Sequence, residues 1–406
     1  MQLKLIIFVA NILGWTSRAT HRGSGVMLSG RLILKFQPNA AEILSKNMRV
    51  ALISGTNGKT TSTALVNAGI ATRFSTVSNF TGANLFAGVA SALSQNSAAE
   101  IAVLEVDELV IPWAITQTKP ELVLLLNLGR DQLDRISEVR VVALKWKEAL
   151  KNLPMSSEIL ADADDPFVVW AAKDWPQVTW FSSGSLGHID ASTCPECGEV
   201  LWWNEKGSDY SCLCGFAKPK PDWVFSKGIL KGPKKVKIEV ISAIPGVAGI
   251  SNAARALVAC AHFGIALEEA ASAIAKISSV DGRFGALNIG KTCFRLLLSK
   301  NPASWRETLA TSQDGPANIL LFVNANTQDG KDTSWLWDVD FAPLRGRKVL
   351  VSGDRRSDVS ARLTVNGIAH EVVQNELAAS QIFGAGEADL IASYTAFHRL
   401  AKGARR

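Results

Sequence analysis

Short, nearly continuous apolar runs alternate with longer stretches of helical periodicity from about residue 41 onward. These runs predict strands over residues 49–54, 101–106, 121–127, 158–161 and 178–181. Strands that lack polar alternation are buried on both faces, as in a parallel sheet covered by helices. Helical periodicity returns over residues 251–263 and 267–277. The first part of the chain is therefore predicted to be an α/β domain with a parallel sheet.

A second series of the same kind follows, with apolar runs at residues 293–299, 318–324, 348–352 and 389–393. At 406 residues the chain has room for two or three domains. We expect an N-terminal segment over residues 1–40, a central domain over 41–283 and a C-terminal α/β domain over 284–406, with the boundary near Gly282-Arg283. Between residues 188 and 222 the composition changes to Cys, Trp, Gly and Pro, which indicates an inserted module.

A glycine-rich turn joins the first strand to a helix and reads Gly55-Thr56-Asn57-Gly58-Lys59-Thr60-Thr61. In this setting, backbone N–H groups and the helix dipole attract phosphate. Lys59 would reach the terminal phosphates of a nucleotide, and the Thr60 hydroxyl would hold Mg²⁺. The general phosphate-loop pattern has a glycine five residues before Gly58, where this chain has Ile53, so the loop is a shorter variant.

Two further polar stretches follow apolar strands, where ligands of open α/β sheets bind. In Glu105-Val106-Asp107-Glu108, Glu105 is the first candidate for a Mg²⁺ ligand and Asp107 the second, with a helix N-cap cluster as the alternative. Residues 127–135 could position Mg²⁺ and a reacting carboxyl group, or form a salt-bridged loop.

Four of the six cysteines cluster as Cys194, Cys197, Cys212 and Cys214, which indicates a reducing compartment and a structural zinc site rather than a disulfide framework. The second pair is unusually tight, so a remnant ribbon without metal is the alternative. Cys260 and Cys293 lack a nucleophile pattern, and the five histidines are scattered. We therefore expect no glutamine-hydrolysing site in this chain.

Net charge is +6 with a pI near 9.0, which suits an anionic substrate, an anionic membrane face or nucleic acid. Residues 3–13 are apolar but too short to span a bilayer, and Lys4 interrupts them. A helix packed on the first domain explains this segment better than a weak signal peptide does. We expect a soluble protein.

Residues 324–341 are dense in Asp and Trp and follow an apolar strand. Tryptophans beside acids favour a built site or a partner surface, with a loop pinned by aromatic packing as the alternative.

Taken together, these motifs resemble the Mur ligase family, whose phosphate loop has the same residues. The similarity covers roughly residues 12–400 and is strongest to the branch that amidates lipid II. It is carried by the phosphate loop and by Thr81–Asn84, residues 105–108, residues 130–135, the cysteine insertion, Lys300-Asn301-Pro302, residues 329–341 and Gly353-Asp354-Arg355. The fold it implies is a central P-loop domain with a parallel sheet, an inserted Cys₄ ribbon and a Rossmann-like C-terminal domain.

The resemblance also implies a reaction. ATP would phosphorylate the D-glutamate α-carboxyl of lipid II, and ammonia from a separate glutaminase subunit would convert it to D-isoglutamine. Asp338, with Asp332 as fallback, would complete the Cys-His pair of that partner in a heterodimer. Residues 55–61 and Asn252 would bind ATP, and Thr60 and Glu105 would hold Mg²⁺. The chain would work in the cytoplasm at the inner membrane face, without a nucleic-acid partner.

Other readings remain open. Amino-acid-adding family members carry a His where Gln132 stands, so a stem-peptide or folylpolyglutamate-type ligase is the alternative within enzymes. A nucleic-acid-binding zinc-ribbon NTPase would need a basic face, but the ribbon mixes lysines with acids. A non-catalytic scaffold would not need Lys59, Thr60 and Glu105.

Overall fold

The computed structural model describes residues 2–19, 25–79, 82–130, 138–184, 188, 190–280 and 284–403. The chain forms two compact units. Unit 1 comprises Met1–Leu128, Glu138–Ser242 and Ile250–Ile277, and unit 2 comprises Gly129–Ser137, Ala243–Gly249 and Ser278–Arg406. The expected boundary at Gly282-Arg283 lies outside the described residues.

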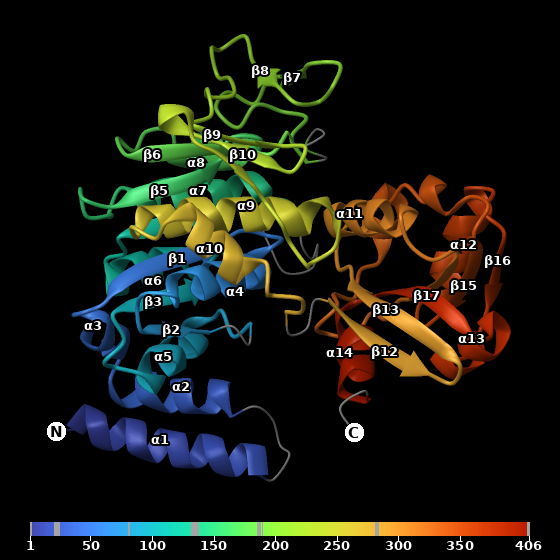
Figure 1. The fold of residues 1–406 in the computed structure, drawn as a ribbon, viewed down its shortest axis with the longest axis horizontal. Helices are drawn as coiled ribbons and strands as arrows, with labels where there is room; N and C mark the ends of the chain where they lie inside the picture. The colour runs from blue at the N-terminus through green and yellow to red at the C-terminus, as the bar shows by residue number, and fades with distance from the viewer. Residues whose placement is uncertain are drawn as a thin grey trace. The chain divides into compact units, whose positions relative to one another are not determined.

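Unit 1 is built on a nine-stranded sheet in the order β11-β10-β9-β6-β5-β4-β1-β3-β2. The strands from β2 to β9 in this order are parallel, and β10 and β11 add an antiparallel edge (Figure 1). The strand bounds are β1 (Arg49–Ser54), β2 (Thr76–Ser78), β3 (Ile101–Glu105), β4 (Leu122–Leu125), β5 (Glu158–Asp162), β6 (Val178–Ser182), β9 (Trp223–Ser226), β10 (Ile229–Lys231) and β11 (Lys237–Glu239).

Burial along the central strands explains their composition. Every residue of β3 and β4 is buried, as are five of the six residues of β1, because helices cover both faces of the sheet. The prediction of an α/β fold with a parallel sheet is confirmed. The short strands β2 and β9 to β11 were not predicted, since three or four residues carry too little pattern.

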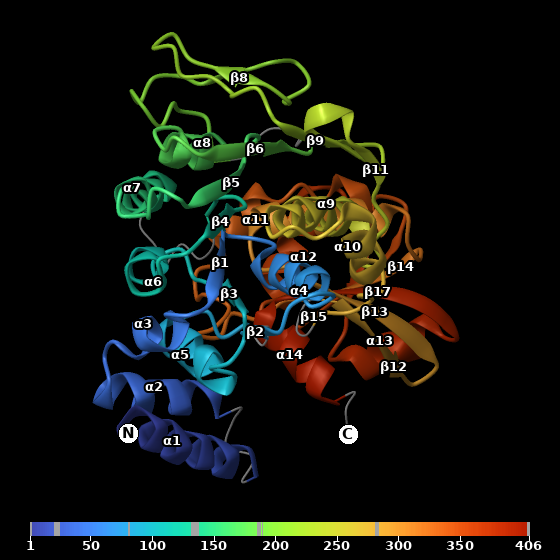
Figure 2. The ribbon, with the colours of Figure 1, turned by 60° about the vertical axis from the view of Figure 1, so that its left-hand side comes forward.

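Helices form a layer on each face of this sheet (Figure 2). One face is covered by α4 (Lys59–Ile70), α9 (Gly246–His262, in unit 1 from residue 250) and α10 (Leu267–Ile274). The other is covered by α5 (Phe86–Gln95), α6 (Ile111–Thr118), α7 (Val139–Leu150) and α8 (Pro166–Ala172). The short helix α3 (Ala40–Ser45) packs on α5 and α6.

Two further helices extend this second layer outward. Helix α2 (Val26–Phe36) packs on α5, and α1 (Gln2–Ala19) packs on α2 (Figure 1). Gly30 permits the first contact, since a Cβ there would lie 1.7 Å from the Ala87 carbonyl oxygen. Helix α2 begins at Val26, and its small residues Ser29 and Gly30 are buried in these helix contacts. None of the helices in the described ranges is both long and apolar enough to cross a membrane.

The cysteine-rich insertion projects between β6 and β9 and carries the hairpin β7 (Trp202–Trp203) and β8 (Tyr210–Ser211) (Figure 1). Its attachment to the sheet is polar. The Tyr210 hydroxyl donates to the Ala163 carbonyl over 3.1 Å, and Lys218 Nζ lies 2.6 Å from a carboxylate oxygen of Asp164.

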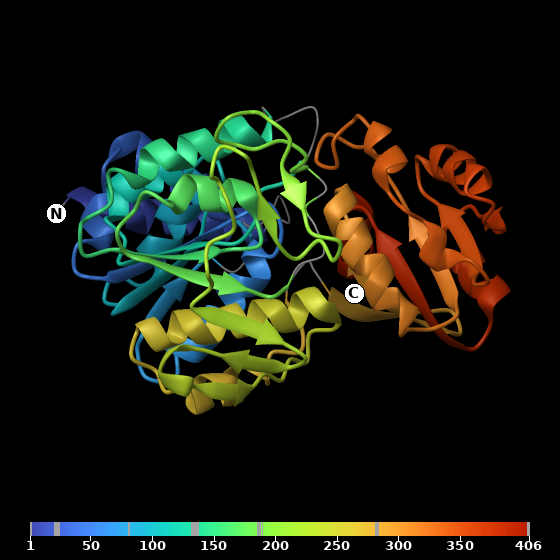
Figure 3. The ribbon, with the colours of Figure 1, turned by 90° about the horizontal axis from the view of Figure 1, so that it is seen from above.

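Unit 2 contains a six-stranded sheet in the order β12-β13-β17-β14-β15-β16, parallel except for β12 (Figure 3). Its elements are β12 (Phe284–Ile289), β13 (Thr292–Leu298), α11 (Pro302–Gln313), β14 (Asn318–Phe322), β15 (Lys348–Ser352), α12 (Arg356–Val365), β16 (His370–Val372), α13 (Glu376–Phe383), β17 (Gly386–Ala392) and α14 (Tyr394–Gly403).

Alternate residues of these strands enter two separate cores. In β14, Ile319 and Leu321 join the core that contains Trp305 and Phe341, whereas Leu320 and Phe322 join the core on the other face. This alternation follows from the two-residue repeat of a strand, and it makes both faces of the sheet apolar.

Candidate active site

The phosphate loop lies between the end of β1 and the start of α4. Gly58 has φ +84° and Gly55 has φ +147°, a region that other residues rarely adopt. A Cβ on Gly55 would lie 2.8 Å from Leu126 Cβ and 2.9 Å from the Asn127 amide nitrogen. Glycine is therefore required here both by backbone conformation and by space.

Asn127, which follows β4, holds the loop in place. Its carbonyl accepts from Thr56 N over 2.8 Å, and its side chain pairs with the Asn57 backbone, accepting over 2.9 Å and donating over 3.0 Å. The sequence had placed Asn127 only at the start of a polar stretch. Its position next to the loop depends on β4 pairing with β1, which only the sheet order reveals.

Lys59 is buried, and its ammonium group is held by three oxygens. It donates to the carbonyls of Gly55 and of Thr56, the latter over 3.3 Å, and to Glu108 Oε1 over 3.2 Å. The side chains of Lys59 and Glu108 are 6% and 5% exposed. Of the acids that follow β3, the one that pairs with the loop lysine is therefore Glu108, which had not been singled out.

Glu105 is fully buried at the end of β3. Its backbone is clamped by the Asn79 side chain, which accepts from the amide and donates to the carbonyl, both over 2.7 Å. Its Oε1 accepts from Asn84 over 3.0 Å, whereas Oε2 has no hydrogen-bond partner among the residues described. Asp107 instead accepts from the Leu109 amide over 3.0 Å and so caps the turn before α6, whose own N-cap residue is Val110.

Asn252 on α9 lies beside the phosphate loop, since a Cβ on Gly58 would be 3.1 Å from its Nδ2. Arg255, one helical turn later, donates to Asn252 Oδ1 over 3.2 Å and also pairs with Asp162 at the end of β5. Burial raises the pKa of Asp162 to about 7, and the Arg255 guanidinium limits that rise. This network fixes Asn252 at the edge of the loop.

These residues fit a nucleotide with Mg²⁺. The buried Lys59 and Thr60 open α4, where backbone N–H groups and the helix dipole favour phosphate. Glu105 Oε2, which has no hydrogen-bond partner among the described residues, is available to bind a hard cation, and carboxylates are preferred Mg²⁺ ligands.

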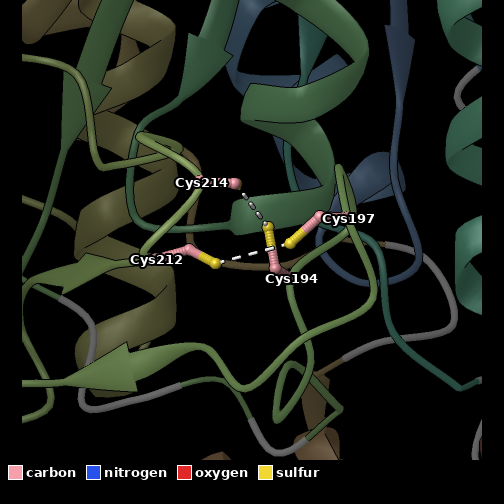
Figure 4. Close-up of side chains that lie close together, drawn as sticks. All are labelled: Cys194, Cys197, Cys212 and Cys214. Carbon is pink, nitrogen blue, oxygen red and sulfur yellow. Dashed lines mark hydrogen bonds between the residues drawn. The ribbon is translucent and has the colours of Figure 1, made fainter.

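The four clustered cysteines converge on one point from two loops (Figure 4). All four sulfurs lie within 4.8 Å of one another, with Sγ–Sγ distances of 3.7 Å for Cys194–Cys214 and 3.6 Å for Cys197–Cys212. Four sulfurs around zinc at about 2.3 Å stand roughly 3.8 Å apart. The tight second pair is therefore compatible with a tetrahedral site.

Asp338 is exposed in unit 2, at the end of the short 3₁₀ helix η2 (Ser334–Asp338). A carboxylate oxygen lies 3.0 Å from Arg130, which belongs to the same unit. The neighbouring Trp335 is buried and Trp337 is 60% exposed. Asp332 is also exposed, and a hydrogen bond from the Ser334 amide holds the pKa of its carboxyl below the usual value.

Two other predicted stretches have different outcomes. Thr81 and residues 131–137, with Gln132, lie outside the described residues. Asn301 caps α11 by accepting from the Ser304 amide over 2.9 Å. Trp305, on the same helix, is fully buried against Trp335 and Phe341 and belongs to the core of unit 2.

Comparison with known proteins gives consistent matches over most of the chain. Residues 53–194 match the Mur ligase middle domain, and residues 298–397 match the MurT ligase C-terminal domain. The MurT subunit of the glutamine-hydrolyzing lipid II isoglutaminyl synthase of Staphylococcus aureus is 28% identical over 381 residues, 88% of this chain and 86% of that protein. The corresponding subunit of Streptococcus pneumoniae is 27% identical over 408 residues, 92% and 91% of the two chains.

The fold agrees with these sequence matches. MurF ligase from Thermotoga maritima, solved in complex with ADP, superposes with a TM-score of 0.65 at 15% identity, covering 90% of this chain and 82% of that one. The chain therefore combines a Mur ligase middle domain with a MurT ligase C-terminal domain on a Mur ligase fold, and it is similar along most of its length to MurT subunits.

Proposed function

We propose that this chain is the ligase subunit of a two-subunit enzyme that amidates the D-glutamate α-carboxyl of lipid II. ATP and Mg²⁺ bind the phosphate loop, and ammonia comes from a separate glutaminase subunit of the class I amidotransferase type. The two subunits form a heterodimer that works in the cytoplasm at the inner membrane face. The similarity to MurT subunits along nearly their whole length supports this assignment.

The reaction has two steps. A carboxylate oxygen of D-glutamate attacks the γ-phosphorus of ATP. The bond between this phosphorus and the oxygen of the β-phosphate breaks, and ADP leaves. Ammonia then attacks the carbonyl carbon of the acyl phosphate, inorganic phosphate leaves, and the nitrogen loses a proton to give the amide. Both steps depend on positioning and on charge neutralisation at the phosphates.

Each residue of the loop contributes a defined part. Residues 55–61 bind the phosphates through the Lys59 ammonium and the backbone amides at the start of α4, while the amides of Thr56 and Asn57 hold the loop on Asn127. Asn252 is proposed to border the adenine. Thr60 and Glu105 would hold Mg²⁺, which supplies positive charge between the β- and γ-phosphates. The observation that carries this half of the proposal is the buried, unpartnered Glu105 oxygen near a phosphate loop.

Asp338 is proposed to complete the Cys-His pair of the glutaminase. A third triad member must be rigid, because it orients the imidazole. The Arg362 guanidinium holds the Asp338 loop through bonds to the Leu336 and Trp337 carbonyls, each over 3.2 Å, and covers the Trp337 ring at 5.0 Å. An exposed tryptophan beside an exposed acid is also a favourable anchor for a partner. Asp332 is the fallback.

The cysteine site is proposed to hold structural zinc. Four thiolate ligands leave no open coordination position, so the ion would stabilise the ribbon without taking part in the reaction.

The ligase half is tested with Lys59→Ala, compared with Lys46→Ala at an exposed lysine. Each variant is co-expressed with a candidate glutaminase, and amidation of lipid II with ATP and either glutamine or ammonia is measured by mass spectrometry. Lys59→Ala should abolish amidation from both nitrogen sources, and Lys46→Ala should leave it intact. Equal activity of the two variants would contradict a role for this loop in ATP use.

The partner half is tested with Asp338→Asn, with Asp340→Asn as a control that removes an acid from the same loop. Asp338→Asn should abolish the use of glutamine and preserve amidation with free ammonia. If Asp332→Asn shows this pattern instead, the fallback holds. If Asp338→Asn loses both activities, Asp338 is not part of a glutaminase triad.

The alternative, an amino-acid-adding ligase, makes a different prediction. Such an enzyme would extend a peptide or folate substrate when given ATP and an amino acid, and it would not bind a glutaminase in a pull-down.

A further inference from the structure

Helix α1 carries a continuous apolar stripe on its outward face. The exposed fractions are 64% for Leu5, 63% for Phe8, 47% for Val9, 45% for Ile12 and 63% for Trp15. These positions are spaced by three, one, three and three residues, so they lie on one side of the helix. Large apolar side chains gathered in this way mark an interaction surface rather than scattered exposure.

The opposite face of α1 is fixed against α2. Ala10 and Gly14 are buried there, and Ser29 Oγ donates to the Ala10 carbonyl over 2.8 Å. A Cβ on Gly14 would lie 2.3 Å from Ser29 Oγ, so the two helices meet closely. Because this contact sets the rotation of α1, the stripe points away from unit 1, and α1 forms its outermost layer (Figures 1 and 2).

The charge around the stripe identifies its partner class. Residues 1–41 contain five basic residues and no acidic one. Of the basic residues, Lys4, Arg31 and Lys35 are exposed on α1 and α2. A partner that only covers the apolar stripe would not require this excess of positive charge. A second copy of this chain would bring its own basic residues close to these, and the two sets would repel each other. An anionic lipid surface satisfies both the apolar stripe and the positive charge.

We propose that α1 docks this protein on an anionic bilayer, lying in the plane of the interface with its stripe among the upper acyl chains. Trp15 then sits at the depth that its ring favours, Lys4 lies next to Leu5 of the stripe and faces lipid phosphates, and the other basic residues of the segment add to the attraction. Docking extends the proposed function, because it brings the ligase to a lipid-linked substrate. It requires only the bilayer and can hold or fail independently of the reaction.

The test is co-sedimentation of the full-length protein with vesicles of phosphatidylcholine alone or with about 30% phosphatidylglycerol. The wild type should bind the anionic vesicles at least ~10-fold more tightly than the neutral ones. Phe8→Glu with Ile12→Glu should reduce anionic binding by at least ~10-fold, because it places two charges in the stripe. Met155→Glu with Val365→Glu, at positions 68% and 66% exposed, should leave binding unchanged.

A second pair of variants separates the contributions and guards against misfolding. Lys4→Glu with Lys35→Glu should weaken binding to anionic vesicles only, whereas Leu5→Ser with Trp15→Ser should weaken it without adding charge. All variants should keep the wild-type unfolding midpoint and ATP binding.

The proposal is overturned if the wild type binds neither vesicle, or if Phe8→Glu with Ile12→Glu binds as tightly as wild type. It is also overturned if sedimentation velocity reveals a dimer that these changes dissociate while vesicle binding is absent. Loss of amidation with vesicle binding intact would instead count against the proposed reaction.

Discussion

Replacing Glu105 by glutamine should stabilise the nucleotide-free protein and remove the stability gained from Mg²⁺ and ATP. Glu105 is fully buried, and only one of its two carboxylate oxygens has a hydrogen-bond partner among the described residues. This carboxylate destabilises the nucleotide-free protein, because no hydrogen bond from the described residues replaces the water that Oε2 loses on burial. Glutamine has the same shape, keeps an acceptor for Asn84 and carries no charge.

The expected magnitudes follow from that geometry. A buried polar group without a hydrogen bond costs about 1–3 kcal/mol. Glutamine removes the buried charge but leaves its NH₂ group unpaired in the same place, so only part of that cost is recovered, and we expect a gain of roughly 1 kcal/mol. Because the unfolding entropy grows with chain length, the unfolding midpoint of this 406-residue protein would rise by about 1 °C. ATP with Mg²⁺ at 100 times its Kd stabilises the wild type by about 2.7 kcal/mol, and the variant should lose most of this gain.

The assay is chemical and thermal unfolding of wild type and variant, each with and without Mg²⁺ and ATP. Asp107→Asn is the matched control, since it removes an acid two residues away whose carboxylate only caps a turn. It should change neither quantity by more than about 0.5 kcal/mol. The reasoning is refuted if Glu105→Gln destabilises the empty protein and still gains full stability from Mg²⁺ and ATP.

Two other predictions concern the ribbon. Burial disfavours the Asp164 carboxylate, but Lys218 more than offsets this and holds the pKa of Asp164 below its usual value. The pair therefore stabilises the protein above about pH 4 and loses this effect as pH falls through the lower folded pKa. Asp164→Asn should cost roughly 3 kcal/mol at pH 7, with the difference from wild type shrinking below about pH 4 in urea unfolding curves. Cys197→Ser should release bound zinc, measured by a colorimetric chelator, and expose residues 190–222 to protease while ATP binding is retained. Full zinc content in that variant would exclude Cys197 as a ligand.

The structural features that depend on a local pattern of residues could be predicted from the sequence. The apolar runs at residues 49–54 and 348–352 became β1 and β15 with unchanged bounds. The phosphate loop was recognisable because glycine and lysine at fixed spacing are required by its conformation. The fold class followed from the alternation of these runs with helices.

Features that depend on tertiary contacts could not be predicted in this way. Residues 105–108, at the end of β3 and in the turn after it, contain three acids. Which of them faces Lys59 is set by that turn, so Glu108 was missed. Asn127 supports the loop only because β4 lies beside β1. Likewise, the burial of Trp305 depends on packing against Trp335 and Phe341, which lie 30 or more positions later in the chain.

The ion pair between Lys59 and Glu108 has a consequence for ligand selection. Lys59 is paired with the Glu108 carboxylate, so an anion that binds the loop must replace this carboxylate as the ionic partner of the lysine. A triphosphate chelated by a divalent ion brings several contacts to that exchange, whereas inorganic phosphate brings few. The Lys59–Glu108 pair would therefore disfavour the binding of small cellular anions and leave the loop available to nucleotides.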